Sequence, residues 1–159
     1  MTKTGIEKPD RIKVLILCIG NLCRSPFAER LLKARIPSDK LDAEVFSRGT
    51  MAQRGATPTK EAIEAAKKWN IDLSDHRSHP LDLCDINTSD LILTMDSMTA
   101  ETLNDLYELW DIAIPLGRFY PDYFIPDIED PYGKGVEEYI KCYEMIEKCV
   151  DGFIQFYTE

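Results

Sequence analysis

A short and almost entirely apolar segment stands near the start of the chain, at residues 12–17, and only Lys13 interrupts it. An apolar run of this length without alternation is typical of a strand buried on both faces, as in a parallel sheet. A loop at residues 18–24 follows, and then Ser25-Pro26. Serine is a favoured N-cap and proline is favoured at the first helical position, so this pair predicts the start of a helix.

Strand and helix signals continue to alternate along the chain. Further strands are expected at residues 43–47, 91–95 and 112–116. Helices are expected from Thr57-Pro58 onward, around Leu103, Leu106 and Trp110, and across 136–154, where apolar residues recur at helical spacing. Strands that alternate with helices indicate βαβ units, in which ligands bind beyond the carboxyl ends of the strands. We therefore expect an α/β fold with a four-stranded parallel sheet and helices on both faces.

Length and charge limit the classes of protein that remain. With 159 residues the chain suits one domain, and we expect a flexible lead-in at residues 1–11 and a single domain at residues 12–159. The net charge of −9 disfavours nucleic acid and anionic membrane surfaces as partners. No apolar run approaches the ~18 residues of a membrane helix, and no signal-peptide pattern opens the chain, which predicts a cytoplasmic protein.

The cysteines argue against a disulfide framework, because their number is odd. They stand at positions 18, 23, 84, 142 and 149. No two of them have C-x-x-C spacing, and both histidines lie far from any cysteine pair, so no zinc site is expected. In a reducing compartment each cysteine is then either a small core residue or a reactive thiol.

The loop at residues 18–24 has the composition of an anion site. It leads into a helix N-terminus, where free backbone N–H groups and the helix dipole attract negative charge. Gly20 and Asn21 tolerate backbone conformations that other residues resist, and Arg24 can bind two phosphate oxygens at once. We therefore expect a phosphate-binding loop after the first strand. The sequence lacks both the Gly-Lys-Ser ending of nucleotide-binding loops and a G-x-G-x-x-G fingerprint.

Cys18 gains a chemical role from this position. A thiol at a helix N-terminus beside an arginine ionises more readily than a free thiol, and a thiolate beneath a bound phosphoryl group is a nucleophile aimed at phosphorus. The hydroxyl of Ser25 could hydrogen-bond that thiolate and stabilise it as a leaving group. On the loop alone a plainer interpretation stays open, in which Cys18 is a buried strand end and Arg24 a surface charge.

The loop and its surroundings resemble the low-molecular-weight protein tyrosine phosphatase family. That family's signature, C-x-G-N-x-C-R-S-P directly after the first strand, is matched at every fixed position by residues 18–26. The likeness covers nearly the whole chain and continues through Ser47-Arg48-Gly49-Thr50, His76-Arg77, Met95-Asp96 and Asp130-Pro131-Tyr132-Gly133. The resemblance implies a metal-independent hydrolase of phosphotyrosine in proteins and of aryl phosphates.

The resemblance implies catalytic roles for three residues. Cys18 would form a phosphocysteine intermediate, Arg24 would clamp the phosphoryl group, and Asp130 would protonate the leaving phenolate and then activate water. A proton donor whose role reverses is what a two-step displacement needs. Because the backbone and Arg24 would carry the charge stabilisation, neither a metal nor a cofactor is implied. Taken alone, Asp130 also fits a loop aspartate before proline, which is a common turn former.

Binding and supporting residues are implied in the same way. Cys23 would form a reversible disulfide with Cys18 under peroxide, which would make the enzyme redox-regulated. Tyr132 would stack on the aromatic leaving group. The substrate would also meet Ile19, Gly20, Asn21, Leu22, Cys23 and Ser25, and the loop would be supported by Ser47, His76 and Asp96. The implied partners are phosphotyrosine-containing proteins, with inorganic phosphate or similar oxyanions as inhibitors.

Two positions depart from the family's pattern. Many members have an aromatic wall residue a few positions after S-A-G-T, where this chain has Gln53, and the usual asparagine after M-D-x-x is Thr99 here.

Three alternative functions stay open. An arsenate reductase on the same fold would need two further relay cysteines, and a protein-arginine phosphatase would place threonine where Leu22 stands. A non-catalytic phosphate-binding module would have lost Cys18 or Asp130.

Overall fold

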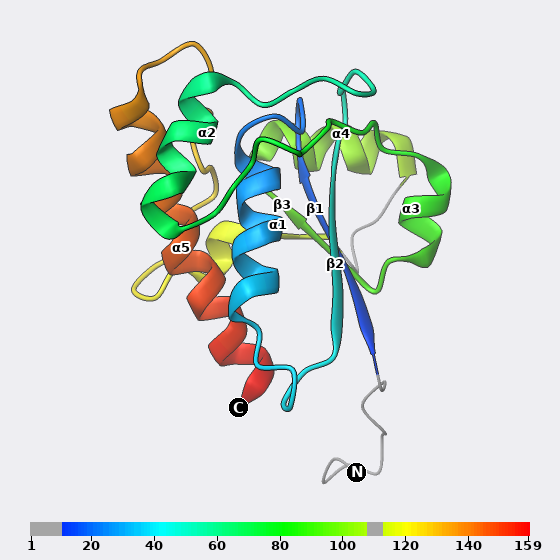
Figure 1. Ribbon diagram of the computed structural model, residues 1–159. Coiled ribbons are helices and arrows are strands. Elements are labelled where there is room, and N and C mark those ends of the chain that lie inside the picture. Colours follow the sequence, from blue (N-terminus) through cyan, green and yellow to red (C-terminus); the bar gives the residue numbers. More distant parts are fainter. Residues whose placement is uncertain (1–10, 108–112) are drawn as a thin grey trace, which may run out of the picture.

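The four predicted strands form one parallel sheet in a computed structural model that describes residues 11–107 and 113–159 (Figure 1). The strand order is β2-β1-β3-β4, so β1 and β3 are central. The strands are β1 (Ile12–Cys18), β2 (Ala43–Gly49), β3 (Leu91–Thr94) and β4 (Ala113–Pro115). Cys18 pairs with Gly49, and Leu17 pairs with both Arg48 and Thr94. The carboxyl ends of β1, β2 and β3 therefore meet at one edge of the sheet, where the predicted loop lies.

Helices cover both faces of this sheet, which confirms the predicted fold class (Figure 1). One face carries α1 (Arg24–Arg35), α2 (Lys60–Ala66) and α5 (Val136–Thr158). The other face carries α3 (Leu83–Thr88) and α4 (Ser97–Tyr107). Two short 3-10 helices complete the described elements, η1 (Lys67–Trp69) and η2 (Leu116–Phe119).

The two faces of β1 divide the core into two clusters. Val14 and Ile16 belong to the larger cluster, which includes apolar side chains of α1, α2 and α5. Leu15 and Leu17 belong to the smaller one, with side chains of α3 and α4. All four side chains are fully buried. Burial on both faces explains why the segment shows no alternation of polar and apolar residues.

The last predicted helix is α5, and it packs directly on α1. The ring of Tyr143 stacks on the ring of Phe27, with 3.9 Å between the centroids and 7° between the planes. Tyr139, one turn earlier on α5, is fully buried as well. The apolar face of α5 thus lies over the helix that begins at the predicted phosphate loop.

The start of α1 differs from the prediction. The helix begins at Arg24 rather than at Ser25-Pro26, and Cys23 occupies the N-cap position without a side-chain capping bond. Ser25 does not cap the helix because its hydroxyl lies 2.9 Å from the sulfur of Cys18, within the loop. A tertiary contact has replaced the local capping preference of serine.

The start of α2 differs for a similar reason. The helix begins at Lys60, and its N-cap is Thr59 rather than Thr57. The side-chain oxygen of Thr59 accepts a hydrogen bond from the backbone N–H of Ala62 at 3.2 Å. The N-cap of α2 therefore lies directly after Thr57-Pro58, the pair that predicted the start of this helix.

No sequence pattern predicted α3. Its N-cap, Asp82, accepts a hydrogen bond from the backbone N–H of Asp85 at 2.9 Å, and the side chain of Asp85 accepts one from the backbone N–H of Asp82 at 3.1 Å. This pair is a reciprocal capping box built from two aspartates, whereas the usual signal ends in glutamate or glutamine. The helix has six residues, too few for an apolar period to show.

Several predictions fall on residues outside those described. Helix α4 begins at Ser97 and contains the predicted Leu103 and Leu106, whereas Trp110 and Ile112 lie outside the described residues. The lead-in at residues 1–11 also lies outside them, apart from the exposed Arg11, and so stays a prediction. Among the helices that the structure describes, none combines the length and the apolar character needed to cross a membrane.

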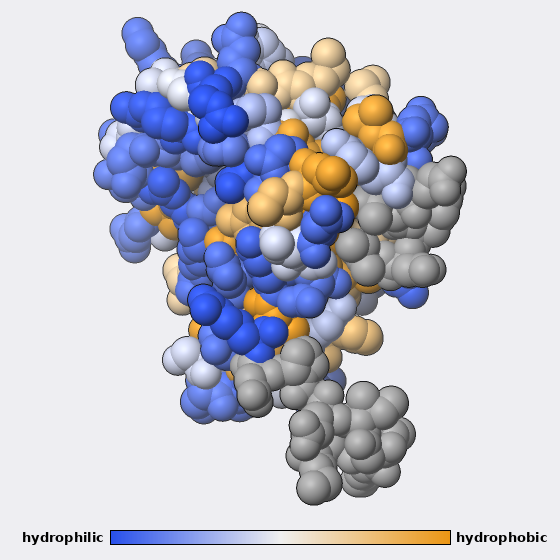
Figure 2. Space-filling view, turned by 90° about the vertical axis from the view of Figure 1, so that its right-hand side faces the viewer, coloured by the Kyte–Doolittle hydropathy of each residue, from blue (hydrophilic) through white to orange (hydrophobic). Residues whose placement is uncertain are grey.

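Figure 2 shows the side of the molecule that lies to the right in Figure 1, where α3 is drawn. Hydrophilic residues cover most of this face, with a few apolar patches among them. Phe46 of β2 lies between two cations, with Lys13 Nζ at 4.7 Å and the Arg48 guanidinium at 4.9 Å from its ring centroid. Charged residues beside an edge strand disfavour its pairing with a second chain.

Candidate active site

The loop at residues 18–24 joins the carboxyl end of β1 to the N-terminus of α1, as predicted. Cys18 is the last residue of β1 and is buried. Its sulfur lies 2.9 Å from the hydroxyl of Ser25 and accepts a 3.2 Å hydrogen bond from the backbone N–H of Asn21. Two hydrogen-bonding groups therefore hold the sulfur at the start of the loop.

Asn21 ties the loop to three other parts of the fold. Its φ of 56° lies in the left-handed region, which asparagine tolerates better than most residues. Its side-chain amide donates to the hydroxyls of Ser25 at 2.9 Å and Ser47 at 3.0 Å. Its Oδ1 accepts from the backbone N–H of His79 at 2.9 Å. One buried side chain thus connects the loop with α1, with β2 and with the segment before α3.

The guanidinium of Arg24 is only 2% exposed and faces several acceptors. Its Nη1 donates to Asp96 Oδ2 at 2.8 Å and to the carbonyl of Ile128 at 2.7 Å. Its Nη2 lies 3.6 Å from Asp130 Oδ2. Burial alone would lower the pKa of Arg24, but the charges of Cys18, Asp96 and Asp130 outweigh burial and raise the pKa above its ordinary value. Arg24 is therefore a fixed cation at the start of α1.

Asp130 lies on the segment that leads from η2 into α5, and its side chain is 41% exposed. Its Oδ1 accepts a hydrogen bond from the backbone N–H of Tyr132 at 3.0 Å. The segment is anchored at Ile128, whose backbone N–H donates to the carbonyl of Met95 at 2.8 Å. The carboxyl group of Asp130 is thus held near Arg24 while it remains open to solvent.

One pocket of about 200 Å³ joins the loop to the segment of Asp130. Its lining consists of Cys18, Ile19, Gly20, Leu22, Cys23, Arg24, Asp130 and Tyr132. All three predicted catalytic residues are therefore brought together. Of the residues predicted to meet the substrate, Asn21 and Ser25 are fully buried and contact Cys18 instead of lining the pocket.

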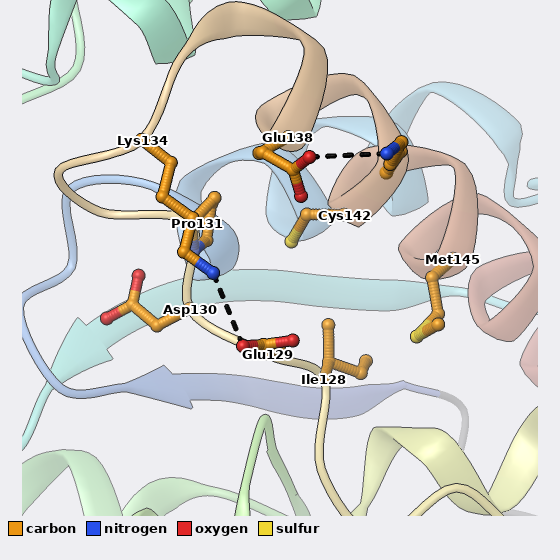
Figure 3. Close-up of a pocket in the computed structure, with 9 residues that line it drawn as sticks. Ile128, Glu129, Asp130, Pro131, Lys134, Glu138, Cys142 and Met145 are labelled. Atoms are coloured by element: carbon orange, nitrogen blue, oxygen red, sulfur yellow. Dashed lines mark hydrogen bonds and ion pairs between the residues drawn. The ribbon is translucent and has the colours of Figure 1, made fainter.

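A second pocket, of about 180 Å³, borders the same segment (Figure 3). In Figure 3 the carboxyl group of Asp130 points away from Cys142 and Met145 of α5. Glu129 and Lys134 form an ion pair of 3.3 Å beside this pocket. Asp130 lines both pockets, so the segment that carries it has open space on two sides.

Two of the predicted supporting residues contact Asn21. The Nε2 atom of His76 lies 2.8 Å from the carbonyl of Asn21, and burial lowers the pKa of His76. A carbonyl only accepts, so the neutral imidazole donates from Nε2. Ser47 accepts from Asn21 and donates to Glu29 Oε1 at 2.9 Å. His76 thus holds the backbone of the loop at Asn21, and Ser47 holds the side chain of the same residue.

Asp96, the third predicted support, acts on Arg24. Its Oδ1 accepts from the backbone N–H of Thr99 at 2.8 Å while its Oδ2 accepts from Arg24. Burial would raise the pKa of Asp96, but the hydrogen bonds from Thr99 and Arg24 outweigh it and hold the pKa below its usual value. Position 99 makes this contact through its backbone N–H, which does not depend on the side chain at that position.

The other departure from the family's pattern lies away from the pocket. Gln53 is exposed and is not among the residues that line the pocket, and its backbone carbonyl accepts a hydrogen bond from the hydroxyl of Ser78. Cys84 is exposed on α3, across the sheet from α5, which carries Cys142 and Cys149. The fold therefore does not gather the relay cysteines that an arsenate reductase would need.

Some residues that shape the loop carry little signal in the sequence. A Cβ atom at Gly49 would lie 2.6 Å from the carbonyl oxygen of Ile19 and 2.9 Å from the backbone nitrogen of Asn21, so only glycine fits there. Tyr143 donates from its hydroxyl to the carbonyl of Cys23 at 2.8 Å. The spacing along α5 predicts a core ring at position 143, and buried tyrosine hydroxyls usually find a partner, but no pattern names that partner.

Comparisons with known proteins agree with this geometry. Residues 13–158 match a family model described as low molecular weight phosphotyrosine protein phosphatase. The probable low molecular weight protein-tyrosine-phosphatase EpsP of Ralstonia nicotianae is 32% identical over 142 residues, which are 89% of this chain and 92% of that protein. The low molecular weight protein tyrosine phosphatase from T. tengcongensis superimposes with a TM-score of 0.83 and 34% identity, covering 91% of this chain and 99% of that one. The YwlE arginine phosphatase from Geobacillus stearothermophilus gives a TM-score of 0.82 and 28% identity, covering 91% and 92%.

Proposed function

Since this chain belongs to the low molecular weight phosphotyrosine protein phosphatase family and is an enzyme of that class, we propose that Cys18 is its nucleophile, Arg24 its phosphate clamp and Asp130 its acid and base. One observation carries the proposal. The three side chains line a single pocket where β1 runs into the N-terminus of α1. A thiol, a fixed cation and a solvent-accessible carboxyl group are together what metal-free phosphoryl transfer to sulfur requires.

In the first step the sulfur of Cys18 attacks the phosphorus of phosphotyrosine, and the bond from phosphorus to the phenolic oxygen breaks. The backbone N–H groups of the loop and the guanidinium of Arg24 neutralise the charge that spreads over the phosphoryl oxygens. Asp130 gives its proton to the leaving oxygen. The products are a phosphocysteine and the dephosphorylated tyrosine.

In the second step Asp130 takes a proton from a water molecule whose oxygen attacks the phosphorus. The phosphorus–sulfur bond breaks, and inorganic phosphate leaves. The hydroxyl of Ser25, 2.9 Å from the sulfur, stabilises the departing thiolate of Cys18. Because Arg24 and the backbone supply the positive charge, the proposed mechanism uses no metal ion.

The substrate that we propose is phosphotyrosine in proteins. Tyr132 is 63% exposed at the pocket and can stack on an aromatic leaving group, while Ile19 and Leu22 supply apolar contacts. Because an arginine phosphatase has a similar structure, phosphoarginine is the alternative substrate. The bulk of Leu22 at the pocket favours the aromatic substrate instead. Hydrolysis of phosphotyrosine and phosphoarginine peptides of the same sequence separates the two.

We further propose three properties that follow from the site. Phosphate-like oxyanions compete with substrate, because they fit the same loop. Cys23, which lines the pocket with Cys18, closes a reversible disulfide with it under peroxide. The enzyme works in the cytoplasm, where its five free cysteines stay reduced.

The test is hydrolysis of p-nitrophenyl phosphate by the wild type, Cys18→Ser and Cys84→Ser, with reductant and with a chelator in place of added metal. Cys84 is a matched control because it is exposed on α3, away from the pocket. We expect turnover in the wild type and Cys84→Ser and none in Cys18→Ser, which should still bind inorganic phosphate in a calorimetric titration. Appreciable turnover by Cys18→Ser would remove the nucleophile assignment.

A further inference from the structure

Two tyrosines of α5 contact the same loop residue at different atoms. Tyr143 donates to the carbonyl of Cys23 at 2.8 Å, and the hydroxyl of Tyr139 lies 3.4 Å from the sulfur of Cys23. Both rings are fully buried. The two positions are one helical turn apart and share a face of α5. Helix α5 thus holds the backbone of Cys23 with one tyrosine and its thiol with the other.

A third hydrogen bond sets the direction of the Tyr139 contact. Thr59, the N-cap of α2, accepts from the backbone N–H of Ala62 at 3.2 Å and donates to the hydroxyl oxygen of Tyr139 at 3.0 Å. A hydroxyl has only one proton to donate, and Tyr139 does not need its own proton for Thr59. The proton of Tyr139 is therefore free to be donated to the sulfur of Cys23. A thiolate at Cys23 has no proton of its own, so it accepts this hydrogen bond.

Cys23 stands where a thiol ordinarily stays protonated. It is buried at 5% exposure, and burial raises the pKa of Cys23 to about 11, while the hydrogen bond from Tyr139 acts in the opposite sense. The thiolate is the reactive form of cysteine, and a donor aimed at the sulfur stabilises that form. The contact with Tyr139 therefore favours reaction at a thiol that its surroundings otherwise make inert.

We propose that Tyr139 is a positioning residue that prepares the thiol of Cys23 for attack on an oxidised Cys18. This inference rests on the redox role proposed above for the two cysteines. Hydrogen peroxide oxidises the thiolate of Cys18 to a sulfenic acid, with hydroxide as the other product. The sulfur of Cys23 then attacks the sulfur of Cys18, the sulfur–oxygen bond breaks, and the hydroxide leaves with the proton of Cys23 as water. Tyr139 stabilises the negative charge on the Cys23 sulfur as that proton departs.

The rate of this step decides how much enzyme survives oxidation. A sulfenic acid that is not captured reacts with more peroxide and becomes a sulfinic acid, which thiol reductants do not reverse. Capture by Cys23 gives a disulfide that thiols reduce. Tyr139 thus sets the fraction of Cys18 that ends as a recoverable disulfide.

Tyr139→Phe and Tyr143→Phe form a matched pair for the test. Each variant removes one hydroxyl from a buried ring of α5, but only Tyr139→Phe removes a contact to the thiol of Cys23. Wild type and variants are treated with hydrogen peroxide, and mass spectrometry measures Cys18–Cys23 disulfide against Cys18 sulfinic acid. We expect disulfide formation about tenfold slower in Tyr139→Phe, the effect of losing one hydrogen bond to a developing charge. In Tyr143→Phe the ratio of Cys18–Cys23 disulfide to Cys18 sulfinic acid should equal that of the wild type.

A second measurement tests the reactivity of the Cys23 thiol without any oxidation. In a Cys18→Ser background, alkylation of Cys23 by iodoacetamide should be slower by a similar factor when Tyr139→Phe is added. Thr59→Val, which removes the donor that orients Tyr139, should slow alkylation to a smaller extent. Unchanged product ratio and unchanged alkylation in Tyr139→Phe would overturn the role of Tyr139. A wild type that forms no Cys18–Cys23 disulfide would overturn the redox role itself, while its turnover of p-nitrophenyl phosphate would leave the phosphatase mechanism standing.

Discussion

The guanidinium of Arg24 donates from Nη1 to Asp96 Oδ2 at 2.8 Å, and only 2% of the arginine side chain is exposed. Asp96→Asn keeps an acceptor at this place but removes the charge that faces the guanidinium. We expect kcat/KM for p-nitrophenyl phosphate to fall about ten- to a hundredfold, because hydrogen bonds to charged groups have free energies of roughly 1.5–3 kcal/mol. Asp127→Asn is the control, since Asp127 contacts Ser97 at the same end of α4 and has no contact to Arg24. Equal losses in both variants would contradict a specific role for Asp96.

Removal of the proposed acid, Asp130, should slow the hydrolysis of substrates with poor leaving groups the most. In Asp130→Ala no proton reaches the departing oxygen, so phenyl phosphate and phosphotyrosine should slow by roughly 10²- to 10⁴-fold. p-Nitrophenyl phosphate should slow less, because p-nitrophenolate leaves without a proton. The measurement is kcat/KM for a series of aryl phosphates of graded leaving-group acidity, because this ratio covers the steps up to departure of the leaving group and not the second step, in which Asp130 also acts. The same slowing across the whole series would take the role of acid away from Asp130.

Gly49 is expected to tolerate no side chain. A methyl group there would lie 2.6 Å from the carbonyl oxygen of Ile19, so Gly49→Ala must displace the loop. We expect a clear rise in KM for p-nitrophenyl phosphate and a loss of unfolding free energy of about 1–3 kcal/mol, as for other overpacked sites. Gly135→Ala is the matched control, because a Cβ atom at Gly135 meets no atom within 4 Å. If Gly49→Ala matched Gly135→Ala in KM and in stability, the close approach would have no consequence.

His76 should make the fold less stable in mild acid. Burial lowers the pKa of His76 below 6.5, so the unfolded chain binds its proton more readily than the folded protein does. The unfolding free energy should therefore decrease as the pH falls from 6.5 toward the folded-state pKa, by about 1.4 kcal/mol for each pH unit between the two values. In His76→Gln this contribution should vanish. Urea unfolding of both proteins from pH 8 to pH 5 measures it, and parallel curves would exclude His76 as its source.

The sheet and the loop could be predicted because their signals are local. The glycine, asparagine and arginine of the loop follow directly after the apolar run of β1. The strand pattern and the loop pattern therefore support each other. The spacing of α5 likewise needs only the residues of that helix. Other elements gave weak or shifted signals because their local pattern is short. Helix α3, with its capping box of two aspartates, is one of them.

The hydrogen bond between Ser25 and Cys18 was predicted, but its effect on the start of α1 was not. The local preference of serine is to cap a helix, yet the hydroxyl of Ser25 is committed to Cys18 and Asn21. Contacts between residues that are distant in sequence could not be predicted from local patterns. Tyr139 and Tyr143 fit the apolar period of α5 as core rings, but only the folded chain shows where their hydroxyls point. The local capping rule fails at Ser25, beside the loop, as expected of a residue in a functional site.

The bond from Tyr143 to the carbonyl of Cys23 spans 120 positions. Polypeptides are made from the N-terminus, so the ribosome releases the loop long before the helix that holds it. A nascent chain that has reached only β4 already carries Cys18 and Arg24 but lacks the tyrosines that fasten the residue between them. Such a chain also lacks Asp130, the proposed acid. We therefore expect activity to appear only when α5 has been synthesised and has docked, so that each new molecule would begin to dephosphorylate substrates late in its synthesis.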